Sequence, residues 1–206
     1  MRSVTTLIEV RPVGPDEVGV VGTLFGSART TRHCWCMSFC TDRVGFAAGW
    51  FGGGNRRRFE TMASGNVPMG VLALVADVPV GWAACGPRSR YLGATPSRHP
   101  LLGDCSRAED ETAWLLPCLF VHPEHRSRGV SHALVDAAVA LARREGAVAL
   151  EGWPLSEQEA RSSDAFVGRE QLFAALGFRC VAQPVPGRAI MRQDLVTPVT
   201  TRRSPC

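Results

Sequence analysis

The stretch that decides the fold runs from residue 119 to residue 133 and reads Leu-Phe-Val-His-Pro-Glu-His-Arg-Ser-Arg-Gly-Val-Ser-His-Ala. The residues from 113 to 121 are almost all apolar, which is typical of a strand buried on both faces. After a polar turn at 122–128, apolar residues recur at helical spacing from Val130 to Leu141, and another apolar strand follows at 147–150. Strand, turn, helix and strand within about 40 residues predict a βαβ unit with two parallel strands.

The rest of the chain predicts further strands and helices around this unit. Apolar segments indicate a strand at 9–12, a hairpin at 71–76 and 80–85, and a closing hairpin at 178–182 and 189–195. Helical patterns cover 16–26, 56–63 (with Asn55 as its cap) and 164–176, whereas 27–54 is expected to be a loop. No linker or repeat divides the 206 residues, so we expect one α/β domain over 1–195 and a flexible C-terminal tail at 196–206.

Composition and charge exclude several classes of protein. Apolar residues make up 45 % of the chain, too many for a disordered protein, but no run approaches the roughly 18 apolar residues of a membrane span. The N-terminus lacks the long apolar core of a signal peptide, which predicts a cytoplasmic protein without membrane contact. The net charge of +4 comes without a dense basic run, so we expect no nucleic-acid partner.

The turn between the first parallel strand and its helix has the chemistry of an anion site. The first turn of any helix has four backbone N–H groups without intrahelical partners, and the helix dipole adds positive potential there. Arg126, Arg128 and the unencumbered backbone at Gly129 would make this helix start a cradle for phosphate. With one Gly and no Lys, the turn is neither a Walker A loop nor a dinucleotide-binding loop.

The same turn resembles motif A of the GNAT superfamily of N-acetyltransferases, whose pattern is Arg or Gln, two residues, Gly, one residue, then Gly or Ala. Arg126, Gly129 and Ser131 fill these places, with Ser131 a mild departure. The segments 119–123 and 173–178 resemble the end of the family's fourth strand and its last helix with the Gly-Phe strand entry. A Cys-Trp-Cys-Met segment at 34–37, with 79–82, 151–154, 165–168 and 190–192, resembles a subgroup frequent in actinobacteria.

This resemblance implies a mixed, strongly twisted sheet, flanked by helices, in which the parallel fourth and fifth strands splay apart at their C-terminal ends. These strands are here 113–121 and 147–152, and acetyl-CoA or another acyl-CoA would fill the gap as cosubstrate. Its binding residues would be Leu119, Phe120 and Val121 along the pantetheine arm, and Arg126, Ser127, Arg128, Gly129, Val130 and Ser131 around the pyrophosphate. The N–H of Leu119 would face the thioester oxygen and stabilise an oxyanion, an effect worth about 3–4 kcal/mol for one donor in a dry site.

Two carboxylates are candidates for the base that the reaction requires. An acceptor ammonium with a pKa of about 10 must lose a proton before it attacks. Glu151, at the end of the second splayed strand, is the leading candidate for this base, directly or through water, and Glu111, just before the first splayed strand, is a weaker alternative.

The resemblance implies that the usual proton donor to the leaving thiolate is missing, because Phe173 stands where many members of the family carry a Tyr. A thiol pKa near 8.5 makes the leaving group tolerable without one, and water, Ser162, Ser163 or Tyr91 are alternatives. Cys118 is expected to be a packed thiol rather than an acylated nucleophile, because no base is evident beside it.

The acceptor pocket is expected to include Cys34, Trp35 and Cys36, together with Trp153. The aromatic content of this set favours an acceptor with an apolar body, although a plain packing cluster would explain the same residues. Cys34, Cys36 and Cys40 lack the second cysteine pair of a structural zinc site, so no metal is expected.

The favoured interpretation is an acyl-CoA-dependent N-acetyltransferase that acylates the amine of a small molecule by direct attack. Two alternatives stay open. The first takes its acyl group from an acyl carrier protein in natural-product biosynthesis, and the second is a CoA-binding module without turnover, which the missing Tyr supports. A homodimer is also open, since relatives often dimerise.

Overall fold

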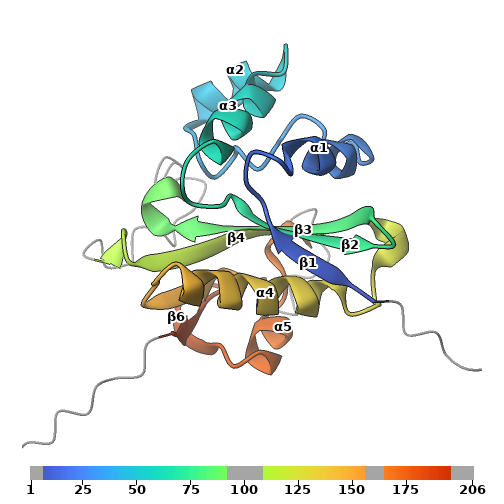
Figure 1. Cartoon of the computed structure of the whole chain (residues 1–206). Helices are drawn as coiled ribbons and strands as arrows, with labels where there is room; N and C mark the ends of the chain where they lie inside the picture. Colours follow the sequence, from blue (N-terminus) through green and yellow to red (C-terminus); the bar gives the residue numbers. More distant parts are fainter. Residues whose placement is uncertain (1–6, 92–108, 156–164, 196–206) are drawn as a thin grey trace, which may run out of the picture.

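The computed structural model describes residues 7–91, 109–155 and 165–195, and its centre is a seven-stranded mixed sheet (Figure 1). The strand order is β1-β2-β3-β4-β5-β7-β6, and among these neighbours only β4 and β5 run parallel. The strands are β1 (Glu9–Pro12), β2 (Gly70–Val75), β3 (Val78–Pro87), β4 (Ala113–Val121), β5 (Ala149–Gly152), β6 (Arg179–Val185) and β7 (Arg188–Asp194). The predicted α/β domain with one parallel strand pair is confirmed.

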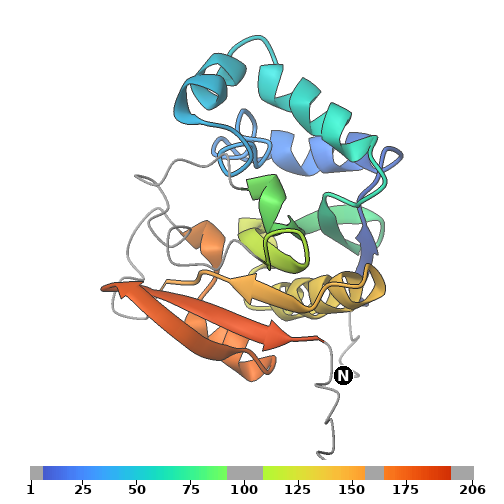
Figure 2. The same ribbon diagram turned by 90° about the vertical axis from the view of Figure 1, so that its left-hand side faces the viewer.

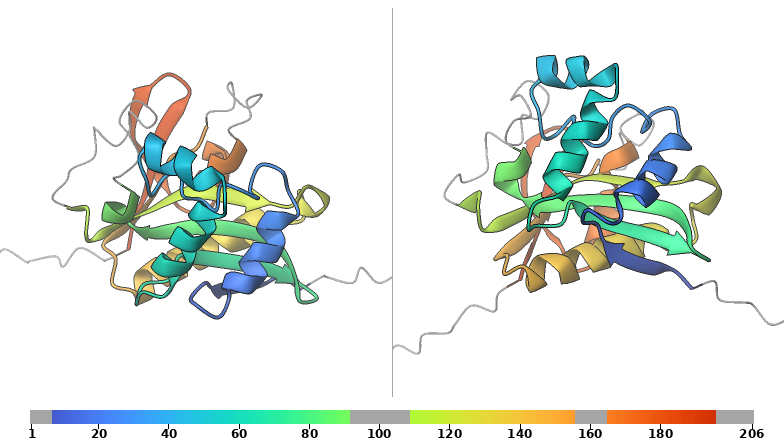
Figure 3. Two further views of the ribbon diagram at one scale, coloured as in Figure 1. Left: turned by 90° about the horizontal axis from the view of Figure 1, so that it is seen from above. Right: turned by 45° about the horizontal axis from the view of Figure 1, so that its top comes forward.

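Helices cover both faces of the sheet (Figures 1 and 3). On one face lie α1 (Val18–Gly26), α2 (Arg43–Trp50) and α3 (Gly54–Ala63), and on the other lie α4 (Val130–Arg144) and α5 (Glu170–Ala175). Short 3-10 turns occupy η1 (Arg88–Tyr91), η4 (Pro123–His125) and η6 (Ala165–Val167). Figure 2 shows the β6–β7 hairpin extending from the edge of the sheet beyond β5.

Two large apolar cores and a smaller third one hold these layers together, and β4 contributes to all three. Leu116 and Leu119 point toward α4, whereas Cys118 and Phe120 point toward α1 and α3. The second core centres on Trp82, whose ring meets Phe25 edge-to-face at 5.8 Å, a favoured aromatic geometry. Because β4 is buried on both faces, its sequence shows a continuous apolar run instead of alternation.

Several local expectations were confirmed and others were wrong. The hairpin of β2 and β3 forms as predicted, around a turn in which Ala76 and Asp77 both have positive φ, as a type I′ turn requires. The segment 27–54 is not all loop, because Asp42 caps α2 by accepting a hydrogen bond from the Gly45 N–H. Asn55 does not cap α3: it is buried, and its Nδ2 donates to the His33 carbonyl at 2.9 Å.

The predicted helix at 164–176 is divided into η6 and α5. Gly168 separates them with φ +77°, a left-handed conformation that interrupts a helix. The predicted flexible tail at 196–206 and the two serines proposed as proton donors, Ser162 and Ser163, lie outside the described residues. Within the described helices, none combines the length and the apolar character that crossing a membrane requires.

Candidate active site

A gap opens between β4 and β5 because their pairing stops before β4 ends. The parallel register runs from Ala113↔Ala149 to Leu116↔Gly152, and β4 then continues for five more residues alongside β3 alone. Pro117, the next residue, has no N–H to donate to a partner strand. Between Leu115 and Cys118, β4 also has one residue more than β3, which is a β-bulge, a feature that locally bends a strand.

The open edge of β4 presents backbone groups to this gap. In an antiparallel pair, successive residues direct their N–H and C=O groups alternately toward and away from the partner. The His122 N–H donates to the Val80 carbonyl at 2.8 Å, so alternation directs residues 118 and 120 toward β3 and residues 119 and 121 toward the gap. The N–H of Leu119 therefore points to where β5 has diverged.

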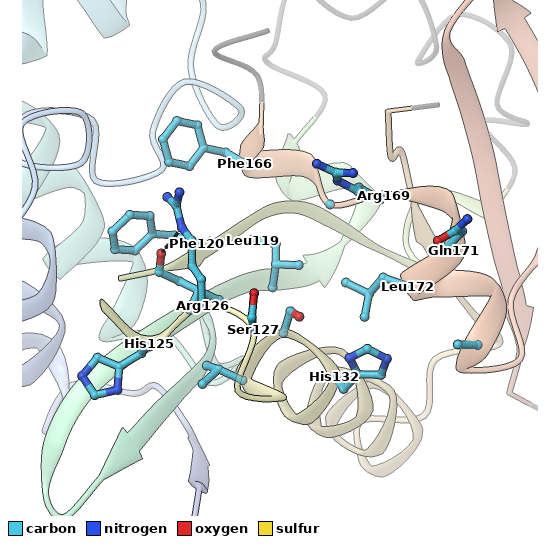
Figure 4. Close-up of a pocket in the computed structure, with 15 residues that line it drawn as sticks. Leu119, Phe120, His125, Arg126, Ser127, His132, Phe166, Arg169, Gln171 and Leu172 are labelled. Carbon is cyan, nitrogen blue, oxygen red and sulfur yellow. Dashed lines mark hydrogen bonds between the residues drawn. The ribbon is translucent and has the colours of Figure 1, made fainter. Parts of the chain in front are cut away.

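A cavity of about 660 Å³ occupies the gap (Figure 4). One wall is the end of β4, and the floor is the turn into α4 with its first residues. The far wall comes from η6, α5 and the residues between them. The lining includes seven of the nine residues predicted to bind the cosubstrate: Leu119, Phe120, Val121, Arg126, Ser127, Val130 and Ser131.

The other two, Arg128 and Gly129, belong to the same turn but do not line the cavity. Ser127 and Gly129 have φ of +58° and +83°, and this left-handed backbone turns the chain into α4. The first backbone hydrogen bond of α4 runs from Ala133 to Gly129 at 3.0 Å, so the preceding N–H groups have no intrahelical acceptor. A Cβ on Gly129 would meet no atom within 4 Å, so the space beside this backbone is open.

The Arg126 guanidinium is held at the mouth of the cavity. Its Nε donates to the Val121 carbonyl at 3.2 Å, one of the groups that face the gap. With the N–H groups at the start of α4 and the helix dipole, it forms a corner of positive potential, which is the chemistry that suits an anion such as phosphate.

Comparison with protein families identifies this architecture. The sequence profile described as the acetyltransferase (GNAT) family matches residues 49–162, more than half of the chain. The chain belongs to the GNAT acetyltransferase family. A sequence comparison with curated proteins returns no match.

Solved structures similar to this GNAT chain share its fold at low identity. The yncA protein of Salmonella typhimurium, solved with acetyl-CoA, is 18 % identical, with a TM-score of 0.54 over 92 % of this chain and 94 % of its own. A mosquito arylalkylamine N-acetyltransferase-like protein is 15 % identical, with a TM-score of 0.56 over 92 % of this chain and all of its own. The paiA N-acetyltransferase of Thermoplasma acidophilum, solved with coenzyme A, is 9 % identical, with a TM-score of 0.53 over 91 % and 99 %.

Eight residues that line the cavity of this GNAT domain escaped the sequence reasoning: His125, His132, Phe166, Gly168, Arg169, Gln171, Leu172 and Ala175. His125 lies in η4 and His132 in the first turn of α4. The other six belong to η6, α5 and the residues between them, and their position beside β4 depends on tertiary packing. The rings of Phe120 and Phe166, both of which line the cavity, pack against each other with their centroids 6.0 Å apart.

Glu151 is buried and lies on β5, opposite Leu115 of β4. Its Oε1 accepts from Arg88 Nη1 at 3.2 Å and from Arg192 Nη1 at 2.9 Å, and it lines neither this cavity nor a second one described below. Leu119 is four residues further along β4, about 13 Å at the usual rise of a strand. From this position Glu151 could act on a substrate amine only through intervening water.

The charged groups around Glu151 connect β5 with β7 and with the segments that follow β3 and precede β4. Buried Arg88 also donates to Asp110 Oδ1 at 2.8 Å, and Arg192 also donates to Glu109 and Asp194. Burial opposes the charge of Arg192, but hydrogen bonds to Glu109 and Asp194 outweigh it and raise the pKa of this guanidinium. Hydrogen bonds from Arg192 and Arg179 lower the pKa of Asp194.

Glu111 lies at the wrong end of β4 for the chemistry. It is exposed, accepts a hydrogen bond from Ser89 Oγ at 3.0 Å, and precedes Leu119 by eight residues, about 26 Å of strand. A carboxylate there cannot reach a thioester beside Leu119, so its position does not support the expected role as a base.

A second cavity, of about 290 Å³, lies on the α1 side of β4. Of the four residues predicted for the acceptor pocket, Cys34 and Cys36 line this cavity, whereas Trp35 and Trp153 do not. Trp35 packs instead in the core against Phe25 and Phe59, and Trp153 is buried with Tyr91. Their rings are used for packing, and the expectation that these two tryptophans contact the acceptor stays a prediction.

Three further residues considered for proton or acyl transfer, Phe173, Tyr91 and Cys118, are buried. Phe173 is fully buried and its ring meets Phe178 at 5.1 Å. Tyr91 lines neither cavity, and burial raises the pKa of its hydroxyl. Cys118 lines the second cavity, where its thiol interacts with the thiol of Cys36. Across the described ranges, no three His, Cys, Asp or Glu side chains form a group that could hold a metal ion.

Proposed function

We propose that this protein is an acyl-CoA-dependent N-acetyltransferase that transfers an acyl group directly to the amine of a small molecule. One observation carries the proposal: β4 continues past its last pairing with β5, and the resulting gap is continuous with the corner of positive potential at Arg126 and the start of α4. A thioester with a phosphorylated tail matches both parts. The Cys-Trp-Cys-Met segment at 34–37 supports a further assignment to the actinobacterial subgroup that it resembles.

The residues present fit such a cosubstrate. The corner offers a guanidinium and free helix N–H groups for the pyrophosphate, and the open edge of β4 offers backbone groups at 119 and 121 for an amide-bearing arm. The apolar side chains of Leu119, Val130 and Leu172 line the cavity between these polar parts.

In the proposed reaction, the amine nitrogen attacks the thioester carbonyl carbon, a C–N bond forms and the C–S bond breaks. The N–H of Leu119 stabilises the developing oxyanion, because it points into the gap and is not used by β3. The amine loses its proton through water to Glu151, and the thiolate takes a proton from water. The thiol pKa of about 8.5 lets the thiolate leave without a dedicated acid.

Titration with acetyl-CoA by calorimetry, followed by an amine panel with thiol detection, tests the proposal. We expect saturable binding of acetyl-CoA and release of one thiol for each amine acylated. Binding without thiol release from any amine would favour a CoA-binding module without turnover, which Phe173 supports because a buried ring cannot protonate a thiolate. Failure to bind acetyl-CoA, with acylation from a charged carrier protein, would favour the carrier-dependent enzyme.

A further inference from the structure

The second cavity has a composition that restricts the acceptor. We infer that the acceptor is a compact primary amine with an apolar body and no second cationic group. This inference rests on the proposed N-acetyltransferase function and specifies its substrate class.

The two cavities are placed for donor and acceptor to meet. Both are lined by Phe166, and they are also lined by consecutive residues of β4, Cys118 on the α1 side and Leu119 on the other. An amine in the second cavity would therefore reach the gap from one face of the sheet, beside the N–H of Leu119.

The walls of the second cavity are apolar. Three phenylalanines and three thiols line it: Phe25, Phe39, Phe166, Cys34, Cys36 and Cys118. Burial raises the pKa of the Cys34 thiol to about 11, and a hydrogen bond with Cys118, together with burial, raises the pKa of Cys36. The thiols of Cys34 and Cys36 are therefore neutral at pH 7, and buried thiols behave as small apolar groups.

Two of the hydroxyl groups in the lining are already engaged. Thr31 Oγ1 donates to the Phe25 carbonyl at 2.8 Å, and Ser38 Oγ accepts from Cys34 Sγ at 3.7 Å. Among the described residues that line the cavity there is no Asp or Glu, and Arg188 is the one charged residue. A second ammonium group would lose hydration here without gaining a counter-charge, which is unfavourable.

Size and backbone conformation support a small, defined site. The volume of about 290 Å³ lies just below the roughly 300–1,000 Å³ of pockets that take drug-sized ligands. Trp35 and Cys36 are consecutive residues with φ of +48° and +53°, a strained arrangement for residues with side chains. This turn holds Cys36 Sγ 3.1 Å from Trp82 Nε1, so the cavity wall is fixed by the core.

Three amines test the inference in the wild-type protein: hexylamine, phenethylamine and hexane-1,6-diamine. The first and third have the same chain and differ by the second ammonium. With saturating acetyl-CoA and thiol detection, we expect kcat/KM for hexylamine and phenethylamine to exceed that for the diamine at least tenfold. Equal or faster acylation of the diamine would overturn this inference and leave the proposed function standing. Absence of acylation of all three, and of any amine in the wider panel, while acetyl-CoA binds, would overturn both.

A matched pair of variants isolates the charge. Ser38→Asp places a carboxylate in the cavity, and Ser38→Asn has nearly the same shape without the charge. We expect Ser38→Asp to shift the ratio of diamine to hexylamine acylation at least tenfold toward the diamine relative to Ser38→Asn. The same ratio in both variants, with acetyl-CoA affinity and circular dichroism unchanged, would contradict the inference.

A second pair locates the acceptor. Thr30 lines the cavity and is exposed, so Thr30→Trp should fill its mouth, whereas Thr23→Trp is an exposed control on α1 away from both cavities. We expect Thr30→Trp to reduce kcat/KM for hexylamine at least tenfold with acetyl-CoA affinity unchanged. Equal activity of the two variants would show that the acceptor binds elsewhere.

Discussion

Arg126 and Gly129 are the residues whose roles follow most directly from local chemistry. The guanidinium of Arg126 is fixed to the Val121 carbonyl at the cavity mouth, and Gly129 leaves the backbone beside the start of α4 uncovered. Both features favour an anionic group. Their contribution to binding can be measured apart from any chemistry.

Arg126→Ala and Gly129→Asp should each weaken acetyl-CoA binding at least tenfold, or about 1.4 kcal/mol. The first removes a cation, and the second puts a carboxylate beside the anion site at a residue with φ of +83°. Calorimetry checks both, and Arg143→Ala, in the last turn of α4, is the control that should bind normally. Wild-type affinity in both loop variants would show that the cosubstrate does not use this turn.

Glu151→Gln should lower kcat while leaving acetyl-CoA affinity nearly intact, because the carboxylate lies outside the cosubstrate cavity. It should also lower thermal stability, since Arg88 would lose one of its buried counter-charges. The pH–rate profile separates the two effects: loss of a base changes the profile, and loss of stability alone does not. Glu111→Gln, which alters an exposed carboxylate, is the control. An unchanged profile in Glu151→Gln would remove it as the base.

At the scale of elements, the gap depends on how β4, β5 and α5 fit together. Pro117 and the bulge lie where the pairing of β4 with β5 ends, and Gly152 is the last residue of β5 that still pairs with β4. A Cβ on Gly152 would overlap the ring of Phe173, which belongs to α5. Close packing of α5 against this glycine therefore keeps the far wall of the cavity in place.

Gly152→Ala should destabilise the protein by about 1–3 kcal/mol, the usual effect of overpacking a core, and should also weaken acetyl-CoA binding by displacing α5. Urea denaturation and calorimetry measure the two effects. Gly19→Ala is the control, because a Cβ there meets no atom within 4 Å and the residue lies in helix α1. Equal stability of the two variants would show that α5 moves freely to make room.

At the scale of the whole molecule, buried thiols make stability sensitive to alkaline pH. Burial raises the pKa of Cys34 to about 11 and those of Cys40 and Cys85 to about 12, from an ordinary value of 9.0. The unfolded chain releases these protons first as pH rises. The stabilisation is therefore complete below pH 9 and is lost between about pH 9 and pH 12.

We expect the urea midpoint to fall steadily from pH 8.5 to pH 10.5. Cys85→Ala should be less stable at neutral pH, because it removes a fully buried side chain, but its midpoint should fall less steeply with pH. A wild-type midpoint that is constant over this range would contradict the assignment of raised thiol pKa values.

The sequence by itself determined the βαβ unit, the parallel strand pair and the turn at Arg126, because these depend on periodicity and on residues close together in the chain. It also indicated the thiols at Cys34 and Cys36 as part of a pocket. The tertiary structure alone decided which residues form the far wall of the cavity, since η6 and α5 reach β4 across more than 40 positions of sequence. It also decided that Trp35 and Trp153 pack in cores and that Glu151 pairs with Arg88 and Arg192. Side-chain direction at these positions is set by packing against distant segments, and no local pattern in a single sequence encodes it.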